Sequence, residues 1–350
     1  MNPRKRTPSL RKSAASRAGA LPYVGRGCVA GVVGMGLMGT SIAACLVGAG
    51  HRLSCIESDP AKLRTAHKRL LNVLNDAWKT GLISVAPDTV MRQVIISGEY
   101  SDLKAAEIVI ESTVEDLTVK HQVIGEIEKA VSSKTLIGSN TSAIPVTDLQ
   151  RGAKHPERIL GLHWAEPANI TRFMEIICGK ETSRQNAQRG MRFARRLGKE
   201  PSLLRKDIRG FITNRIMYAM LREAFYLVEN GFASVADVDR SLRNDLGFWI
   251  TFAGPFRFMD LTGIPAYAAV MKDLLPDLNC ATEVPRLMQE VVQAGARGVS
   301  NAKGFYRYTP AQAKRWENLF IEFSHNIREL AEKYPEDVGD KNSADRLANK

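Results

Sequence analysis

The sequence has no apolar run near the roughly 20 residues that a membrane-spanning helix requires, which argues against a transmembrane protein. Cysteine is also sparse: the 350-residue chain has 5 cysteines, and no two of them form a Cys-x-x-Cys pair. This usage disfavours a disulfide framework or a zinc site and is typical of reduced thiols. We therefore expect no membrane partner, no bound metal and a cytoplasmic protein.

Acidic residues are absent from the start of the chain, where Glu57 is the first. Residues 1–26 hold 7 of the 49 Lys and Arg residues among prolines and small side chains, so we expect a disordered basic tail. A mitochondrial transit peptide is the alternative, because such segments are rich in Arg and Ser and poor in acids. The tail supplies much of the net charge of +12, so nucleic-acid binding is only a minor alternative.

Short apolar runs alternate with longer helical periodicities from Cys28 onward, a pattern typical of a parallel sheet covered by helices. After Lys206 only helical periodicity remains, which indicates a domain boundary there. The charged end of the chain is predicted to be a solvated tail. The predicted strands are 28–34, 51–58, 106–112, 135–140, 158–164 and 172–179, and the predicted helices include 37–50, 60–80, 115–131, 214–231 and 234–242.

A glycine motif, Gly34-x-Gly36-x-x-Gly39, follows the first predicted strand and opens the first predicted helix. Gly34 allows a tight turn, Gly36 lets the backbone approach a pyrophosphate, and Gly39 lets the helix pack closely on the strand. The free N–H groups at the start of the helix favour phosphate. This context predicts a Rossmann-type dinucleotide site, and a purely structural glycine-rich turn is the alternative.

Glu57 ends the second predicted strand, 18 residues after Gly39, where an acid accepts hydrogen bonds from a ribose diol. Together with nearby Asp59 it would repel a 2′-phosphate, so NAD is favoured over NADP. The predicted fold class is therefore α/β, with a Rossmann-type, mostly parallel sheet domain followed by an all-α C-terminal domain. The four predicted segments are a basic tail at 1–26, the NAD-binding domain at 27–205, the helical domain at 206–332 and a polar tail at 333–350.

Two ionisable residues, His163 and Glu175, interrupt the last two apolar strands. Phe173, Glu175 and Ile177 share one face of a strand, so the carboxylate should be withdrawn from water and need a partner. A short connection would place His163 beside it. The carboxylate would fix the imidazole tautomer and leave the other nitrogen free to take a proton from a substrate hydroxyl. Taken alone, His163 could equally be a hydrogen-bonded core or surface histidine.

Eight motifs occur in the order and at about the spacing of the L-3-hydroxyacyl-CoA dehydrogenase family, which the chain resembles from about residue 28 to residue 308. They are GVVGMGLMG, IVIESTVEDLTVK, SNTSAIPV, GLHWAEP with MEIICG, LGKEP, DIRGFITNRI, GPFRFMDLTG and AKGFYRY. The resemblance implies NAD-dependent oxidation of L-3-hydroxyacyl-CoA to 3-oxoacyl-CoA, or the reverse, and a homodimer made through the helical domain.

The resemblance also implies roles for individual residues. His163 would be the general base, oriented by Glu175, while Ser142 and Asn214 would hold the 3-oxygen and the thioester carbonyl of the substrate. Ser142 could instead initiate a turn, and Asn214 could cap a helix. The candidate cofactor-binding residues are Gly34, Gly36, Leu37, Met38, Gly39, Glu57, Glu115, Lys120 and Asn140.

The chain departs from the family pattern at two places. The family usually has His-Phe-Phe-Asn-Pro, whereas this chain has His-Trp-Ala-Glu-Pro at 163–167. Glu166 would either raise the pKa of His163 or repel an anionic substrate. Where the family contacts coenzyme A with a serine and a lysine, this chain has Val73 and Thr80, with Lys79 adjacent. A dehydrogenase of a non-CoA 3-hydroxy acid, of the carnitine or sugar-acid type, is therefore the second hypothesis.

A third hypothesis is a non-catalytic NAD-binding homologue. The presence of the four residues implied in catalysis argues against it, because a structural protein has no need of such a polar set in its cleft. The expected partner is an acyl-CoA or a small 3-hydroxy acid.

Overall fold

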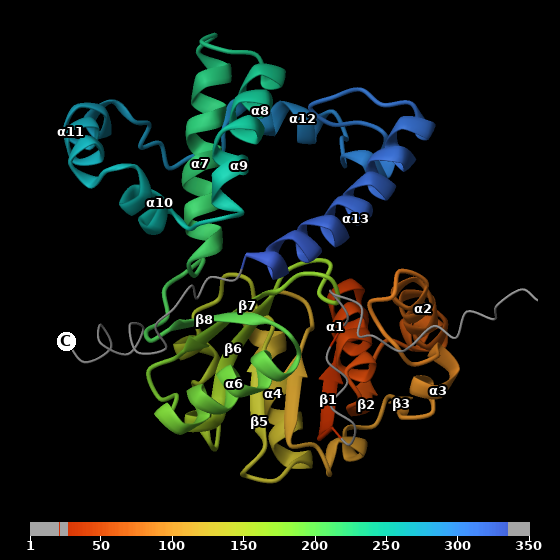
Figure 1. The fold of residues 1–350 in the computed structure, drawn as a ribbon. Helices are drawn as coiled ribbons and strands as arrows, with labels where there is room; N and C mark the ends of the chain where they lie inside the picture. The colour runs from red at the N-terminus through yellow and green to blue at the C-terminus, as the bar shows by residue number, and fades with distance from the viewer. Residues whose placement is uncertain (1–20, 22–26, 335–350) are drawn as a thin grey trace, which may run out of the picture.

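The computed structural model describes residue 21 and residues 27–334. The predicted basic tail, apart from Leu21, and residues 335–350 of the predicted polar tail lie outside the described residues. In the described part, an eight-stranded sheet has helices against both faces and is followed by a helical region (Figure 1). This arrangement confirms the predicted α/β sheet domain followed by an all-α domain.

The sheet has the strand order β3-β2-β1-β4-β5-β6-β7-β8, and its neighbouring strands are parallel except β6 and β7. The order in which the chain adds strands to the sheet reverses between β1 and β4. At such a point, a crevice at the carboxyl ends of the strands can bind a ligand. The strands are β1 (Val29–Val33), β2 (Arg52–Ile56), β3 (Val94–Ser97), β4 (Ile108–Glu111), β5 (Leu136–Ser139), β6 (Ile159–Trp164), β7 (Phe173–Cys178) and β8 (Glu200–Leu204).

The predicted helices are present, and further helices complete both domains. The side chains of Asp59 and Asp116 accept hydrogen bonds from backbone N–H groups at the starts of α2 and α4. These N–H groups have no partner within the helix itself. The helices are α1 (Leu37–Gly48), α2 (Pro60–Lys79), α3 (Pro87–Met91), α4 (Leu117–Ala130), α5 (Val146–Leu149), α6 (Arg184–Arg196), α7 (Thr213–Glu229), α8 (Val235–Asn244), α9 (Leu246–Ile250), α10 (Pro255–Thr262), α11 (Ile264–Leu274), α12 (Arg286–Gln293) and α13 (Pro310–Lys333).

The core consists of two apolar clusters on opposite faces of the sheet. Adjacent strand residues point to opposite faces, so Val32 belongs to one cluster and Val33 to the other. The first cluster includes side chains of α1, α2 and α6, and the second includes side chains of α4 and α5. Burial on both faces explains why the central strands are continuous apolar runs.

The helical region packs differently. Within the described residues, no side chain of α7 to α12 is buried in the single chain. The last helix, α13, leaves this region and runs back towards the sheet domain (Figure 1). Among the described helices, none is both long and apolar enough to cross a membrane.

Candidate active site

The turn between β1 and α1 has the geometry that the glycine motif predicts. Gly34 has a φ of 92°, in the left-handed region that favours glycine. A Cβ on Gly39 would lie 1.8 Å from the Gly34 carbonyl oxygen, so only glycine lets α1 start this close to the strand. A Cβ on Gly36 would meet no atom within 4 Å. This open space at the N-terminus of α1 fits a dinucleotide pyrophosphate.

A hollow of about 480 Å³ opens beside this turn. Glu57 is buried at its edge, and its carboxylate accepts hydrogen bonds from the backbone N–H groups of Met35 (2.9 Å) and Asp59 (3.0 Å). The carboxylate is thus fixed at the end of β2, where it can also accept from a ribose, so the residues present fit NAD. The predicted cofactor-binding residues that line the hollow are Gly34, Gly36, Leu37, Met38, Glu57, Glu115 and Asn140.

His163 and Glu175 face each other directly across β6 and β7, which pair in antiparallel orientation. His163 Nδ1 lies 2.7 Å from Glu175 Oε2. The Glu175 side chain is 1% exposed, which confirms the expectation that it is withdrawn from water. A hydrogen bond through Nδ1 fixes the tautomer and leaves Nε2 as the nitrogen that can exchange a proton with a substrate.

The other oxygen of Glu175 is held at the start of α7. Its Oε1 accepts hydrogen bonds from the backbone N–H groups of Ile212 (3.2 Å) and Thr213 (3.0 Å). Burial alone would raise the pKa of Glu175, but the hydrogen bonds from His163 and from these N–H groups outweigh it and lower the pKa below its usual value. Glu175 is therefore an anion that links the histidine to the first helix of the helical region.

Phe211 packs its ring against the histidine at the same junction. Its ring centroid lies 5.5 Å from that of His163, and the side chain is almost completely buried. Phe211 has a φ of 54°, which costs a non-glycine residue about 1–2 kcal/mol. Sequence reasoning did not identify this residue, because only the preceding Gly210 hints at unusual backbone geometry.

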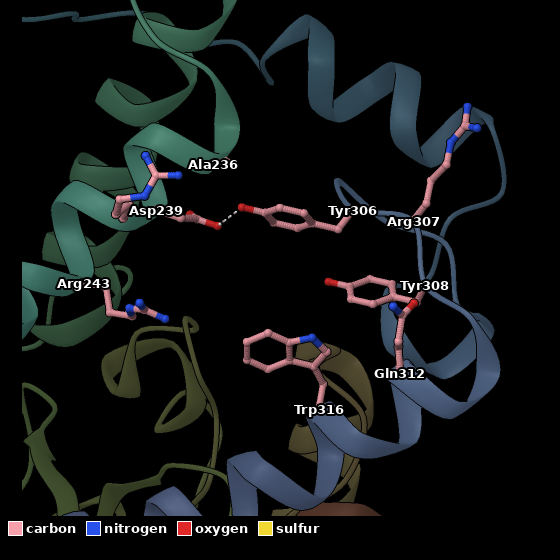
Figure 2. A pocket seen from close by; sticks show the side chains of 9 residues that line it. Ala236, Asp239, Arg243, Tyr306, Arg307, Tyr308, Gln312 and Trp316 are labelled. Carbon is pink, nitrogen blue, oxygen red and sulfur yellow. Dashed lines mark hydrogen bonds between the residues drawn. The ribbon is translucent and has the colours of Figure 1, made fainter.

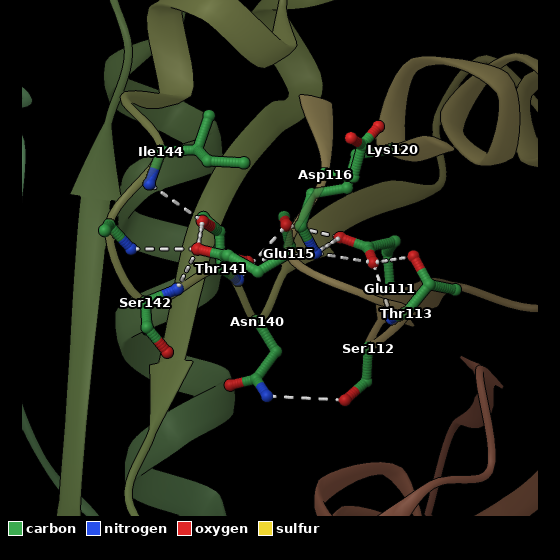
Figure 3. A network of polar contacts seen from close by, with 12 residues as sticks. Glu111, Ser112, Thr113, Glu115, Asp116, Lys120, Asn140, Thr141, Ser142 and Ile144 are labelled. Atoms are coloured by element: carbon green, nitrogen blue, oxygen red, sulfur yellow. Dashed lines mark hydrogen bonds and ion pairs between the residues drawn. The ribbon is translucent and has the colours of Figure 1, made fainter. Parts of the chain in front are cut away.

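Ser142 and Asn214 lie next to each other in the structure. Asn214 Nδ2 donates a hydrogen bond to the Ser142 carbonyl oxygen at 2.8 Å. The N-cap position of α7 is Ile212, so Asn214 does not cap that helix. On the other side, the Glu115 carboxylate accepts hydrogen bonds from the Ser142 backbone N–H (2.9 Å) and from the Thr141 hydroxyl (2.6 Å) (Figure 3). Glu115 and Ser142 both line the nucleotide hollow, and Glu115 holds the Ser142 backbone in place there.

A buried ion pair lies next to Glu115 (Figure 3). Lys120 Nζ is 2.8 Å from Glu111 Oε1, and both side chains are almost inaccessible to water. Ser139 donates its hydroxyl to the other oxygen of Glu111 at 2.5 Å, and Lys120 Nζ lies 3.5 Å from Glu115 Oε2. Lys120 is not among the residues that line the hollow, so it supports Glu115 from behind. The sequence alone identifies Glu111 only as a polar residue at the end of a predicted buried strand.

The departures from the family pattern have structural counterparts. Val73 packs against the apolar core, and the Thr80 hydroxyl donates to the carbonyl oxygen of Asp76 at the end of α2. Lys79 Nζ pairs with Asp76 Oδ1 at 3.8 Å. Glu166 is an exposed residue of the loop after β6, but its carboxyl is partly desolvated by the protein, which raises its pKa.

Two family models match consecutive parts of the chain. The model described as "3-hydroxyacyl-CoA dehydrogenase, NAD binding domain" matches residues 29–208, and "3-hydroxyacyl-CoA dehydrogenase, C-terminal domain" matches residues 210–308. A 5-formyl-3-hydroxy-2-methylpyridine 4-carboxylate 5-dehydrogenase from Mesorhizobium japonicum is 32% identical over 285 residues, which cover 81% of this chain and 91% of that protein. A fatty acid oxidation complex subunit alpha from Shewanella oneidensis is 30% identical, but the chain spans 40% of its length.

Solved structures show the same relationship. A crystal structure of 5-formyl-3-hydroxy-2-methylpyridine 4-carboxylic acid 5-dehydrogenase, an NAD⁺-dependent dismutase, has a TM-score of 0.80 at 30% identity and covers 88% of this chain and 99% of that one. The (S)-3-hydroxybutyryl-CoA dehydrogenase of Ralstonia eutropha has a TM-score of 0.66 at 28% identity and covers 80% and 99%. The chain therefore belongs to the 3-hydroxyacyl-CoA dehydrogenase family of oxidoreductases, and its cofactor is NAD.

Proposed function

We propose that the protein transfers a hydride between NAD and the oxygen-bearing carbon of a small substrate that is not a CoA ester. The observation that carries the chemistry is the buried pair of His163 and Glu175, with 2.7 Å between Nδ1 and Oε2. In oxidation, His163 takes the hydroxyl proton, and NAD, when bound, supplies the hydride acceptor. Glu175 stabilises the resulting imidazolium, while Ser142 and Asn214 position the substrate oxygen.

The substrate class rests on α2 and on the likeness to known proteins. Val73 is apolar and packs against the core, and the Thr80 hydroxyl is already bonded within the end of α2, so neither offers coenzyme A the polar contact that the family makes there. The larger TM-score also belongs to a dehydrogenase named for a pyridine carboxylate rather than for a CoA ester. Both observations favour a free acid.

Oxidation of L-3-hydroxyacyl-CoA is the second candidate. It is favoured by the match of both family models, which together extend from residue 29 to residue 308. The pair of His163 and Glu175 could act on a 3-hydroxy acid or on its CoA ester, because both carry a hydroxyl group and a transferable hydride on the same carbon.

A substrate panel separates the two candidates. NADH oxidation would be followed with acetoacetyl-CoA, acetoacetate and dehydrocarnitine. NAD reduction would be followed with 5-formyl-3-hydroxy-2-methylpyridine 4-carboxylate, whose aldehyde must first add water so that the hydrate carries the hydroxyl proton and the hydride on one carbon. We expect kcat/KM for at least one free acid to exceed that for the CoA ester by about 100-fold or more, the scale of discrimination that contacts in a site can supply. A preference of that size for acetoacetyl-CoA would overturn the proposal and establish the second candidate.

We also propose that two copies associate through the helical region. Phe248 and Phe256 are each 79% exposed in the single chain. An open hollow of about 700 Å³ between α8 and α13 is bordered by the rings of Tyr306, Tyr308 and Trp316 (Figure 2). The exposed rings of Phe248 and Phe256 are unfavourable in water, and a second copy of the same region would cover them.

A further inference from the structure

The loop between β6 and β7, residues 165–172, is irregular and is buried in its middle. It begins two residues after His163, and Ala168, Asn169 and Ile170 are inaccessible or nearly so. An irregular segment in such a place must find partners for its backbone carbonyl oxygens, because buried unpaired polar groups are costly. Two cationic side chains supply these partners.

Lys199 and Arg328 together donate hydrogen bonds to three backbone carbonyl groups of this loop. Lys199 Nζ donates to the carbonyl oxygens of Ala168, at 2.5 Å, and of Thr171. Arg328 Nη1 donates to the carbonyl oxygen of Ile170 at 2.7 Å. Lys199 and Arg328 are 3% and 5% exposed, so both cations are withdrawn from water to make these bonds. Charge-assisted hydrogen bonds of this kind are about twice as strong as neutral ones.

The two cations reach the loop from different domains. Lys199 immediately precedes β8 in the sheet domain, whereas Arg328 lies near the end of α13. The family models end at residue 308, before α13 begins at Pro310. The last helix thus carries a cation from beyond the matched region back to the loop that follows the histidine.

The same loop touches the cofactor side of the crevice. The Ser41 hydroxyl on α1 donates to Asn169 Oδ1 at 3.1 Å. The backbone N–H of Trp164 donates to Asn140 Oδ1 at 3.0 Å, and Asn140 lines the nucleotide hollow. The loop therefore connects α1, the end of β6 and α13, and a displacement at one contact is transmitted to the others through packed groups.

We propose that Arg328 is a positioning residue through which α13 clamps the 165–172 loop and fixes the end of β6, with His163, relative to the nucleotide hollow. Arg328 contacts neither substrate nor cofactor in this account. The effect on turnover rests on the proposed function, whereas the clamp itself does not. A small displacement of a general base is sufficient to lower a rate about 100-fold, because reacting atoms must be aligned closely.

The clamp is tested first by hydrogen–deuterium exchange of the full-length protein, which needs no substrate. The reporters are the backbone N–H groups of Ile170 and Thr171, which bond to the carbonyl oxygen of Pro167. We expect faster exchange in Arg328→Gln, near-normal exchange in Arg328→Lys, and no change in Arg315→Gln, an exposed arginine on the same helix. Unchanged exchange in Arg328→Gln, or equally fast exchange in the Arg315 control, would overturn the clamp.

Kinetics then test positioning, using whichever substrate the wild-type protein turns over. We expect Arg328→Gln to lower kcat by about 10- to 100-fold, with NAD affinity within about twofold of wild type and most of the rate restored in Arg328→Lys. Loss of NAD affinity in step with kcat, or an unchanged kcat despite faster exchange, would refute positioning. If wild type turns over none of the panel, the proposed function fails while the exchange result still decides the clamp.

Discussion

Gly36 and Gly39 differ in the space that a side chain would find around them. A Cβ at Gly39 would overlap the Gly34 carbonyl oxygen, a backbone atom that cannot move aside without displacing the turn. A Cβ at Gly36 would enter open space, and Gly36 has a φ of −70°, which alanine adopts readily. We therefore expect Gly39→Ala to lose the folded state, and Gly36→Ala to fold normally but bind NAD about tenfold or more weakly.

Thermal unfolding of the two variants and calorimetric titration with NAD measure these effects. The paired design separates folding from binding, because the same methyl group is added at two positions three residues apart in one motif. Equal thermal stability of the two variants, or undiminished NAD affinity in Gly36→Ala, would contradict the steric account.

Individual site residues were predictable where the signal is local in the sequence. The glycine spacing and Glu57 follow from a strand, a turn and a helix within about thirty residues. The pairing of Glu111 with Lys120 was not predictable, because it depends on how α4 packs against β4. The positive φ of Phe211 is likewise a product of tertiary packing, since phenylalanine has no preference for that conformation.

At the scale of elements, β7 and the start of α7 are joined by one carboxylate. Because the pKa of Glu175 is lowered in the folded state, its contribution to stability is fully present above its ordinary pKa of 4.5 and is lost as pH falls through the folded value. We expect Glu175→Gln to lower the free energy of unfolding by about 1–3 kcal/mol at neutral pH. This deficit should shrink as the pH falls below 4.5.

Urea unfolding between neutral pH and pH 3 checks this prediction. Glu157→Gln, at an exposed carboxylate of the same sheet domain, is the matched control and should follow wild type at every pH. A deficit in Glu175→Gln that stays constant across the whole range would mean that Glu175 is not held as an anion by β6 and α7.

Elements buried on both sides of the sheet were predictable, and elements at its edges were not. The six predicted strands are present, and each is built mainly from apolar residues. The sequence pattern does not predict β3 or β8, which are the two edge strands of the sheet. Most of their residues remain partly or fully exposed, so their sequences lack that apolar signal.

For the whole molecule, the exposed apolar surface of the helical region predicts association. We expect sedimentation equilibrium to give twice the chain mass for wild type. The double variant Phe248→Glu with Phe256→Glu should be monomeric, because charges would replace the apolar surface that a second copy covers. Trp78→Glu, at an exposed ring on α2 in the sheet domain, should remain dimeric. Wild-type protein at the mass of one chain would refute the proposed association.

The sequence predicted the amphipathic stripe of α7 but not what covers it. A stripe of apolar residues at helical spacing is the same whether its partner belongs to the same chain or to a second one. Within the described single chain, none of the helices α7 to α12 has a buried residue, and this is a property of the assembled fold. For the same reason, the return of α13 to the sheet domain could not be derived from its own sequence.

In the proposed reaction, His163, held by Glu175, moves the proton while hydride passes to or from NAD. The most direct test compares wild type with His163→Gln in two measurements, NAD affinity by calorimetry and turnover by NADH absorbance with the preferred substrate of the panel. We expect unchanged NAD affinity and a kcat lower by about 10²- to 10⁴-fold, the usual contribution of a general base. Full turnover in His163→Gln would contradict it.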